Sequence, residues 1–323
     1  MKTLITIDDF FDLYYKIQIK GLNIITDRLG FNTKSRVKNV WNRSTNPPTN
    51  WWVIPEIQKR WNVLISGQPN MEYQNYFVNK YLIDKRNLKL LSPGCGNGIK
   101  EVEYAKYENF ELVDAFDIAP NRIKDAITNS KKNGLDNIAF SINDLLKFDY
   151  KNNKYDIVVC DMILHHIKRL DIILEKVKNT LKPGGLLVIN EYVGPNRFQF
   201  PSEQISHAEK LLKDMPTNFR GRWNSNSVKS KIYKPGILRM ILADPSEAIN
   251  SENILPEITK RFEIIEEKPY GGNMLHLILK DISHNFLNDD DDALKLLTQL
   301  FEAEDEFIHS NNSSDFLFGV YRK

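Results

Sequence analysis

Leu88-Lys-Leu-Leu-Ser-Pro-Gly-Cys-Gly-Asn-Gly98 is the stretch that decides the fold. Its apolar start predicts a buried strand, the glycines at 94, 96 and 98 interrupt that strand, and a helical stretch comes next, from Ile99. Glycines let a backbone turn sharply and come close to a ligand, and a helix start offers unpaired N–H groups to an anion or polar group. A glycine-rich loop alone is a weak signal, so its interpretation depends on the strands and acids further along the chain.

Four more apolar stretches occur at regular intervals, over residues 111–117, 137–143, 155–160 and 185–190, with helical segments between them. Five nearly continuous apolar strands alternating with helices predict a doubly wound parallel sheet covered on both faces. Ligands of such sheets bind beyond the carboxyl ends of the strands.

Asp117 ends the second of these strands about 20 residues beyond the loop, the spacing at which an acid meets the ribose of an adenosine cofactor. Two kinds of adenosine-binding protein share that scheme. Nicotinamide dehydrogenases use G-x-G-x-x-G, whereas residues 94–98 read G-x-G-x-G. The loop spacing therefore disfavours a nicotinamide-dependent oxidoreductase.

The loop instead resembles motif I (acid-x-G-x-G-x-G) of the class I S-adenosylmethionine (SAM) methyltransferases. Segments 143–145, 155–166 and 182–185 resemble later motifs of that family in the right order, and the matches cover about residues 85–195. Segments 190–199, 244–248 and 270–272 are similar to a bacterial subgroup of small-molecule methyltransferases with a type 11/12-like domain. The resemblance implies a Rossmann-like, seven-stranded, mostly parallel sheet whose last strand is antiparallel.

The resemblance also assigns residues to SAM. It implies that the loop holds the methionine part, Asp117 the ribose, and Asp144 with Leu145 the adenine, while Asp161 lies beside the sulfonium. The cofactor-binding residues expected on this basis are Ser92, Gly94, Cys95, Gly96, Asp117, Ile118, Asn143, Asp144, Leu145, Asp161 and Met162. Ser92 stands where the motif has its acid, and a hydroxyl supplies no charge.

Methyl transfer needs an acceptor held in line behind the methyl carbon, and needs a base only when the acceptor must lose a proton. The candidate catalytic residues are His165, His166 and Glu191, which come just after the fourth and fifth strands. Histidine is often neutral near pH 7 and can accept a proton, although a pocket-lining or capping role is the alternative for these residues. Candidate substrate-binding residues are Tyr192, Arg197, His276 and Trp61. The alternative for His276 is a histidine buried in the core, for Arg197 a solvated side chain, and for Trp61 a ring that fills the core of the cap.

At 323 residues the chain exceeds one α/β domain, so additions are expected. We expect a helical cap over 1–85, a SAM-binding core over 86–193, a substrate-shaping helical insertion over 194–256, and completion of the sheet over 257–323. The last part is expected to hold two helices, near 274–286 and 291–309, and a final strand over 315–322 antiparallel to a sixth strand over 262–268. Tryptophans 41, 51, 52 and 61 are expected to wall the substrate pocket or fill the core of the cap.

A net charge of +2 argues against a nucleic-acid partner. No apolar run reaches membrane-spanning length, so no membrane partner is expected. The acidic N-terminus is unlike a signal peptide. Two cysteines without a disulfide pattern suggest the cytoplasm, and a homodimer is left open. Six histidines and two cysteines show no zinc spacing, and the run 289–292 is expected to start a helix, so no metal is predicted. Asn46-Pro-Pro-Thr49 resembles a DNA amino-methyltransferase motif but lacks its aromatic fourth residue.

The sequence therefore predicts a SAM-dependent methyltransferase that acts on an oxygen or nitrogen atom of a small molecule, a sugar or a secondary metabolite. The alternative is a catalytically silent scaffold that keeps the fold and binds a partner. The serine at position 92 is the sequence feature that favours this alternative.

Overall fold

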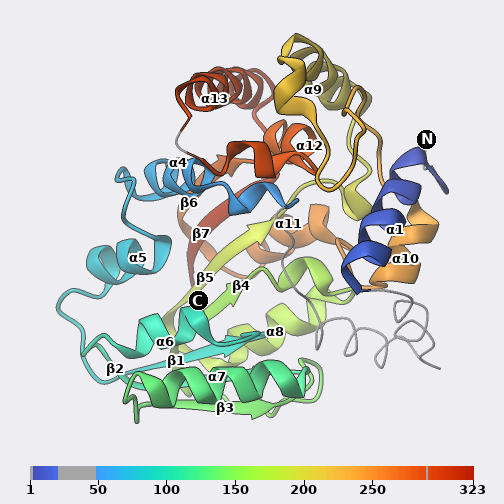
Figure 1. The fold of residues 1–323 in the computed structure, drawn as a ribbon. Helices are drawn as coiled ribbons and strands as arrows, with labels where there is room; N and C mark the ends of the chain where they lie inside the picture. Colours follow the sequence, from blue (N-terminus) through green and yellow to red (C-terminus); the bar gives the residue numbers. More distant parts are fainter. Residues whose placement is uncertain (1–2, 21–48, 289) are drawn as a thin grey trace.

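The structure is a computed structural model that describes residues 3–20, 49–288 and 290–323 (Figure 1). Seven strands form one sheet in the order β3-β2-β1-β4-β5-β7-β6. The first five strands are parallel, and β7 is antiparallel to both β5 and β6, which confirms the predicted fold class. The strands are β1 (Leu88–Pro93), β2 (Phe110–Asp117), β3 (Ile138–Ile142), β4 (Tyr155–Asp161), β5 (Leu181–Tyr192), β6 (Glu263–Gly271) and β7 (Phe316–Arg322).

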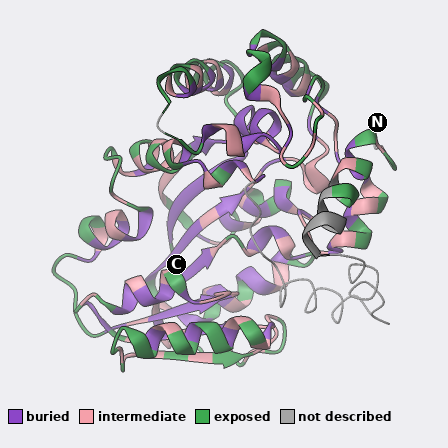
Figure 2. Cartoon of the chain, in the orientation of Figure 1, coloured by how far each residue is buried: buried purple, intermediate pink, exposed green. Residues whose placement is uncertain are grey.

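Helices cover both faces of this sheet, and the alternation of side chains along the strands explains why. Leu90 belongs to one buried apolar cluster and Leu91 to a second, because neighbouring strand residues point to opposite faces. The first cluster includes side chains of α4, α5, α12 and α13, and the second those of α8 and α11. Figure 2 shows the buried strands lying between helices whose outer faces are exposed.

Helices occur in both segments that were expected to be helical, the cap and the insertion. The cap contains α1 (Ile7–Lys20), α4 (Pro55–Ser66) and α5 (Tyr73–Tyr81), and the insertion contains α9 (Ser202–Asp214) and α10 (Ile237–Ala243). The core helices are α6 (Ile99–Ala105), α7 (Pro120–Lys132), α8 (Leu170–Thr180) and α11 (Ile254–Thr259). Single 3-10 turns are η1 (Trp51–Val53), η2 (Leu164–His166), η3 (Asn196–Phe198), η4 (Thr217–Arg220) and η5 (Ser251–Asn253).

The helix predicted near 274–286 is shorter than expected. It forms α12 (Leu275–Leu279) and a separate 3-10 turn, η6 (Ser283–Phe286), because Asp281 between them has a φ of 70°. The ammonium of Lys229 binds the carbonyl oxygens of Leu277, Ile278 and Lys280, which takes these acceptors out of helical pairing. A buried cation thus ends the helix.

The acidic run does start a helix, as expected. α13 (Asp291–Asn311) begins where the Asp290 carboxylate accepts a hydrogen bond from the backbone N–H of Asp292. Trp41, residues 46–48 and Asp289 lie outside the described residues. None of the described helices has both the length and the apolar character needed to cross a membrane.

The N-terminal segment packs beside the insertion, as Figure 1 shows for α1 and α10. Backbone N–H groups of Ile237 and Leu238 donate to carbonyl oxygens of Thr3 and Leu4, and that of Gly236 donates to the Asp9 carboxylate. The N-terminal segment and the segment expected as the insertion therefore contact each other directly.

Candidate active site

The glycine-rich loop is fixed by its neighbours and leaves one part of its backbone open. The N–H groups of Gly94 and Cys95 both donate to the carbonyl oxygen of Phe116 on β2. Gly94 has a φ of +76°, and a Cβ there would lie 2.5 Å from a side-chain carbon of Ile163. Gly96 also has a positive φ, but no atom lies within 4 Å of its Cβ position. A ligand can therefore approach the backbone at Gly96 closely.

Asp117 ties this loop to the second strand. Its carboxylate accepts hydrogen bonds from the N–H of Gly96 at 3.0 Å and from the N–H of Ala119, at the start of α7, at 2.8 Å. Burial raises the pKa of Asp117, although these two hydrogen bonds oppose that change. The acid assigned to ribose thus lies against the loop.

A second carboxyl lies behind the loop, and sequence reasoning missed it. Ser92 donates from its Oγ to Glu101 on α6 over 2.6 Å, and both side chains are buried. The other carboxyl oxygen of Glu101 is buried without a hydrogen-bond partner, and burial raises its pKa to about 7. The carboxyl absent from position 92 is therefore present nine residues later, on the helix that the loop starts.

The end of β4 carries a polar group that faces both the loop and the cap. Asp161 accepts hydrogen bonds from the Tyr73 hydroxyl and from the side-chain amide of Asn190, each at 2.8 Å. Asn190 in turn accepts one from the Tyr270 hydroxyl at 2.6 Å. Burial raises the pKa of Asp161. Met162 comes next with a φ of 51°, a strained conformation for a residue with a side chain.

The segment expected to hold adenine lies next to Asp117, at the end of β3. The Asn143 N–H donates to the carbonyl oxygen of Asp117 at 3.0 Å, and the Asp144 carboxylate accepts from the N–H of Leu146 at 2.9 Å. Leu145 packs at the margin of the second apolar cluster. Ile118 lies between Asp117 and the start of α7 and is partly exposed.

The three predicted catalytic residues lie together, with His165 and Glu191 buried and His166 partly exposed. His165 Nδ1 lies 2.7 Å from a carboxylate oxygen of Glu191, whose other oxygen accepts the N–H groups of Ile163 and Leu164. The His166 ring lies beside that of His165, with centroids 4.1 Å apart. Burial and the neighbouring His165 lower the pKa of His166, whereas carboxylates, Glu191 foremost, outweigh burial and raise the pKa of His165.

A cavity of about 980 Å³ opens beside this group. Asp161, Met162 and both histidines line it together with many aromatic rings. These rings include Trp51, Trp61, Tyr192, Phe198, Phe200, Tyr270, His276 and Phe316. The His276 ring stacks on Trp51 with centroids 5.7 Å apart, and burial lowers its pKa to about 3, so it is neutral. Trp51 both fills the core and walls the cavity, so the two interpretations of this tryptophan hold together.

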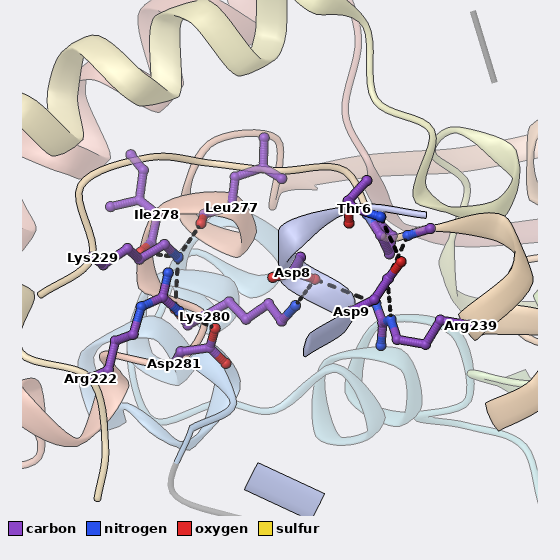
Figure 3. A network of polar contacts seen from close by, with 12 residues as sticks. Thr6, Asp8, Asp9, Arg222, Lys229, Arg239, Leu277, Ile278, Lys280 and Asp281 are labelled. Atoms are coloured by element: carbon purple, nitrogen blue, oxygen red, sulfur yellow. Dashed lines mark hydrogen bonds and ion pairs between the residues drawn. The ribbon is translucent and has the colours of Figure 1, made fainter. Parts of the chain in front are cut away.

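Charged side chains from α1, the insertion and the segment that follows α12 pair with one another in the network of Figure 3. Asp8, Arg222, Lys229, Arg239 and Lys280 of this network line the cavity. Asp8 pairs with Lys280 at 2.6 Å, and Asp9 pairs with Arg239 at 2.7 Å. Arg222 pairs with Asp281 at 2.9 Å. Burial lowers the pKa of Lys229, which binds backbone carbonyls here, to about 7.

The structure separates the predicted substrate-binding residues into two sets. Tyr192, His276 and Trp61 line the cavity, whereas Arg197 is not among its described lining residues. The Arg197 guanidinium donates instead to carbonyl oxygens of Asp244, Pro245 and Glu247 and so holds that loop. Glu191 also lies behind the lining, where it orients His165.

Known proteins match this chain in sequence and in fold. The family described as a methyltransferase domain matches residues 84–288, and the chain belongs to that family. The domain is that of the SAM-dependent methyltransferases, whose cofactor is SAM.

Two curated relatives and one solved structure illustrate the breadth of the similarity. Ubiquinone biosynthesis O-methyltransferase of Rickettsia canadensis is 26% identical over 199 residues, 60% of this chain and 76% of that protein. Human mitochondrial arginine-hydroxylase NDUFAF5 is 26% identical over 188 residues, 55% of this chain and 49% of that protein. The chain thus spans about half the length of the human relative. The fold is shared with geranyl diphosphate C-methyltransferase from Streptomyces coelicolor A3(2), whose structure was solved with Mg2+, geranyl diphosphate and S-adenosylhomocysteine. The TM-score is 0.51 at 10% identity, and the match covers 91% of this chain and 98% of that one.

Proposed function

We propose that this enzyme transfers the methyl group of SAM to an oxygen or nitrogen atom of a small molecule bound in the cavity. One observation carries the proposal: Asp161 and Met162 end β4 at the cofactor edge of the sheet and also line the cavity. Residues of the cap, the insertion and the C-terminal part line the cavity, and its wall combines aromatic rings with charged and polar side chains. Apolar surface with polar groups that orient a ligand is typical of a small-molecule site.

SAM supplies a methyl group activated by a sulfonium. In the proposed complex the open backbone around Gly96 receives the methionine part, Asp117 the ribose, and Asp144 with Leu145 the adenine. Glu101, through Ser92, supplies the carboxyl behind the loop. Asp161 lies beside the sulfonium.

The transfer forms a bond from the acceptor to the methyl carbon, and the electron pair of the broken C–S bond stays on sulfur. Positive charge is lost in this step, so the protein mainly has to align the acceptor and exclude water. A hydroxyl acceptor must also lose its proton. The group around His165, which Glu191 holds in one orientation, is where the chain provides for that loss.

The aromatic wall favours an acceptor with flat or ring-shaped apolar faces, such as a sugar or an aromatic metabolite. The name of the Rickettsia relative, an O-methyltransferase of ubiquinone biosynthesis, supports transfer to oxygen.

The test is release of S-adenosylhomocysteine from SAM with panels of hydroxylated aromatics, sugars and amines, beside DNA, RNA and protein. We expect turnover with a member of a small-molecule panel. Ala243→Phe, at a cavity-lining position of α10, should abolish it while SAM binding is kept. Turnover on a macromolecule alone, or unchanged turnover in Ala243→Phe, would refute the proposal. Tight SAM binding without turnover on any panel would favour the silent scaffold.

A further inference from the structure

Three metal-binding side chains meet at the polar end of the cavity. One nitrogen of His165, one of His166 and a carboxylate oxygen of Glu247 all lie within 4.8 Å of one another. Glu247 comes from the insertion, about 80 residues beyond the histidines, so no spacing rule could reveal the group. All three residues line the cavity.

The hydrogen bonds of His165 leave its lone pair on the cavity side. Glu191 is buried and accepts two backbone N–H groups, so His165 Nδ1 is the donor in their contact. Its Nε2 then carries the lone pair, and this atom lies 3.8 Å from an oxygen of Glu247. A carboxylate that holds the far nitrogen of an imidazole is the usual support of a metal-binding histidine.

The same reasoning fixes the second imidazole. The Ser246 hydroxyl donates to Asp244 at 2.6 Å, so at its 3.1 Å contact with His166 Nδ1 it accepts. His166 is therefore protonated on Nδ1 and carries its lone pair on Nε2. Ser246 thus holds the second imidazole by its Nδ1, as Glu191 holds the first.

An additional carboxylate oxygen is buried here without a partner. Asp244 is 7% exposed and lines the cavity, and its Oδ2 has no hydrogen bond among the described residues. Its other oxygen is engaged by Ser246. The nearby Arg197 directs its donors to backbone carbonyls, so it does not neutralise these acids by direct contact. A buried, unpaired carboxylate oxygen is costly and calls for a cation or a proton donor.

The loop that carries Asp244 and Glu247 is anchored to the histidines. The N–H of Ile249 donates to the carbonyl oxygen of His165 at 3.0 Å, and the N–H of Arg197 donates to that of Ala248 at 2.7 Å. Metal ligands at ~2.1 Å from an ion lie about 3 Å apart. The three ligand atoms lie within 4.8 Å of one another, so the group has to close by up to about 2 Å, and Glu247, whose side chain is 28% exposed, can move.

We infer that His165, His166 and Glu247 bind a divalent transition-metal ion such as Zn2+, Mn2+ or Fe2+. Two imidazoles with one carboxylate suit these ions better than Mg2+ or Ca2+ and leave coordination positions open. The inference rests on the proposed function and specifies it: an acceptor hydroxyl binds the ion and loses its proton to Asp244. Its oxygen then attacks the methyl carbon, and S-adenosylhomocysteine leaves with the electron pair of the C–S bond.

The test is titration of chelator-treated protein with Co2+, Mn2+ and Zn2+, monitored by calorimetry and, for Co2+, by its visible absorption. We expect one ion per chain for at least one of these metals. Glu247→Gln should weaken binding at least tenfold, and Glu191→Gln, which removes the support of His165, should weaken it about 10–100-fold. Glu252→Gln, the same change on an exposed neighbour, should leave binding unchanged.

Saturable binding that is equally tight in Glu247→Gln, or no saturable binding of the three ions, would overturn the inference. SAM affinity measured on the same samples separates the two proposals. A metal-free protein that binds SAM and methylates a hydroxyl at the full rate would refute the metal site and leave the methyltransferase function intact.

Discussion

Glu101→Gln should change how the stability of this protein depends on pH. The pKa of Glu101 rises from 4.5 to about 7 in the folded protein because the side chain is buried. Below pH 4.5 the carboxyl is protonated in both states and contributes no difference. Between pH 4.5 and 7 the folded state binds more protons than the unfolded state, so the free energy of unfolding falls as pH rises. At ~1.4 kcal/mol for each pKa unit, the loss by pH 8 amounts to roughly 3 kcal/mol.

The glutamine cannot ionise, so its stability relative to wild type should improve by about 3 kcal/mol between pH 4.5 and pH 8. This difference between two pH values cancels any constant cost of the amide, whose nitrogen would meet no partner. Urea unfolding at several pH values measures it. Glu103→Gln is the matched control on the same helix, since Glu103 is 45% exposed and pairs with Lys106 on the surface. If the Glu101→Gln and wild-type profiles run parallel, the buried carboxyl behind Ser92 does not titrate as argued.

Three further changes test the loop and the scaffold. Asp117→Ala should weaken SAM binding by more than ~1.4 kcal/mol, or tenfold, because a charge-assisted hydrogen bond to the ligand is lost. Asp114→Ala on the same strand should leave SAM affinity unchanged. Calorimetry on the folded variants measures both affinities, and equal values for the two variants would refute the ribose assignment. Gly94→Ala should destabilise the fold by about 2 kcal/mol or more, measured by thermal unfolding. The glycine has a φ of +76°, and the Cβ of an alanine there would lie 2.5 Å from the side chain of Ile163. An unchanged melting temperature would contradict this prediction. Glu304→Ala should lower the free energy of unfolding by about 3–5 kcal/mol in urea, because the buried carboxylate accepts hydrogen bonds from three backbone N–H groups. Asp305→Ala, at its exposed neighbour, is the control. An equal loss of stability in the two variants would contradict a structural role of Glu304.

The sheet was predictable because its signals are local. The parallel strands are short runs that contain apolar residues, and helices separate them except between β3 and β4, where a loop takes the place of the expected helical segment. The alternation within residues 88–91 already divides the two faces. The loop at 94–98 and Asp117 could be placed for the same reason, since chain order fixes where strand ends meet. The break after α12 could not be predicted, because its cause is Lys229, about 50 residues earlier in the chain.

The site was only partly predictable for a related reason. His165 and His166 follow the end of β4 and Glu191 lies among the last residues of β5, so local pattern could name them as candidates. Glu247 and Asp244 come from the insertion, through a loop that Arg197 holds. Glu101 carried a weak signal: an acid one turn into the helix that the loop starts. A side chain's burial, which gives that acid its meaning, depends on packing that no single stretch of sequence specifies.

Calorimetric titration of the purified protein with SAM and with S-adenosylhomocysteine, beside NADH, tests the central claim most directly. We expect both adenosyl ligands to bind at one site per chain with a Kd of about 1–100 μM, despite the serine at position 92, and NADH not to bind. Binding of NADH, or failure of both adenosyl ligands to bind, would contradict the account.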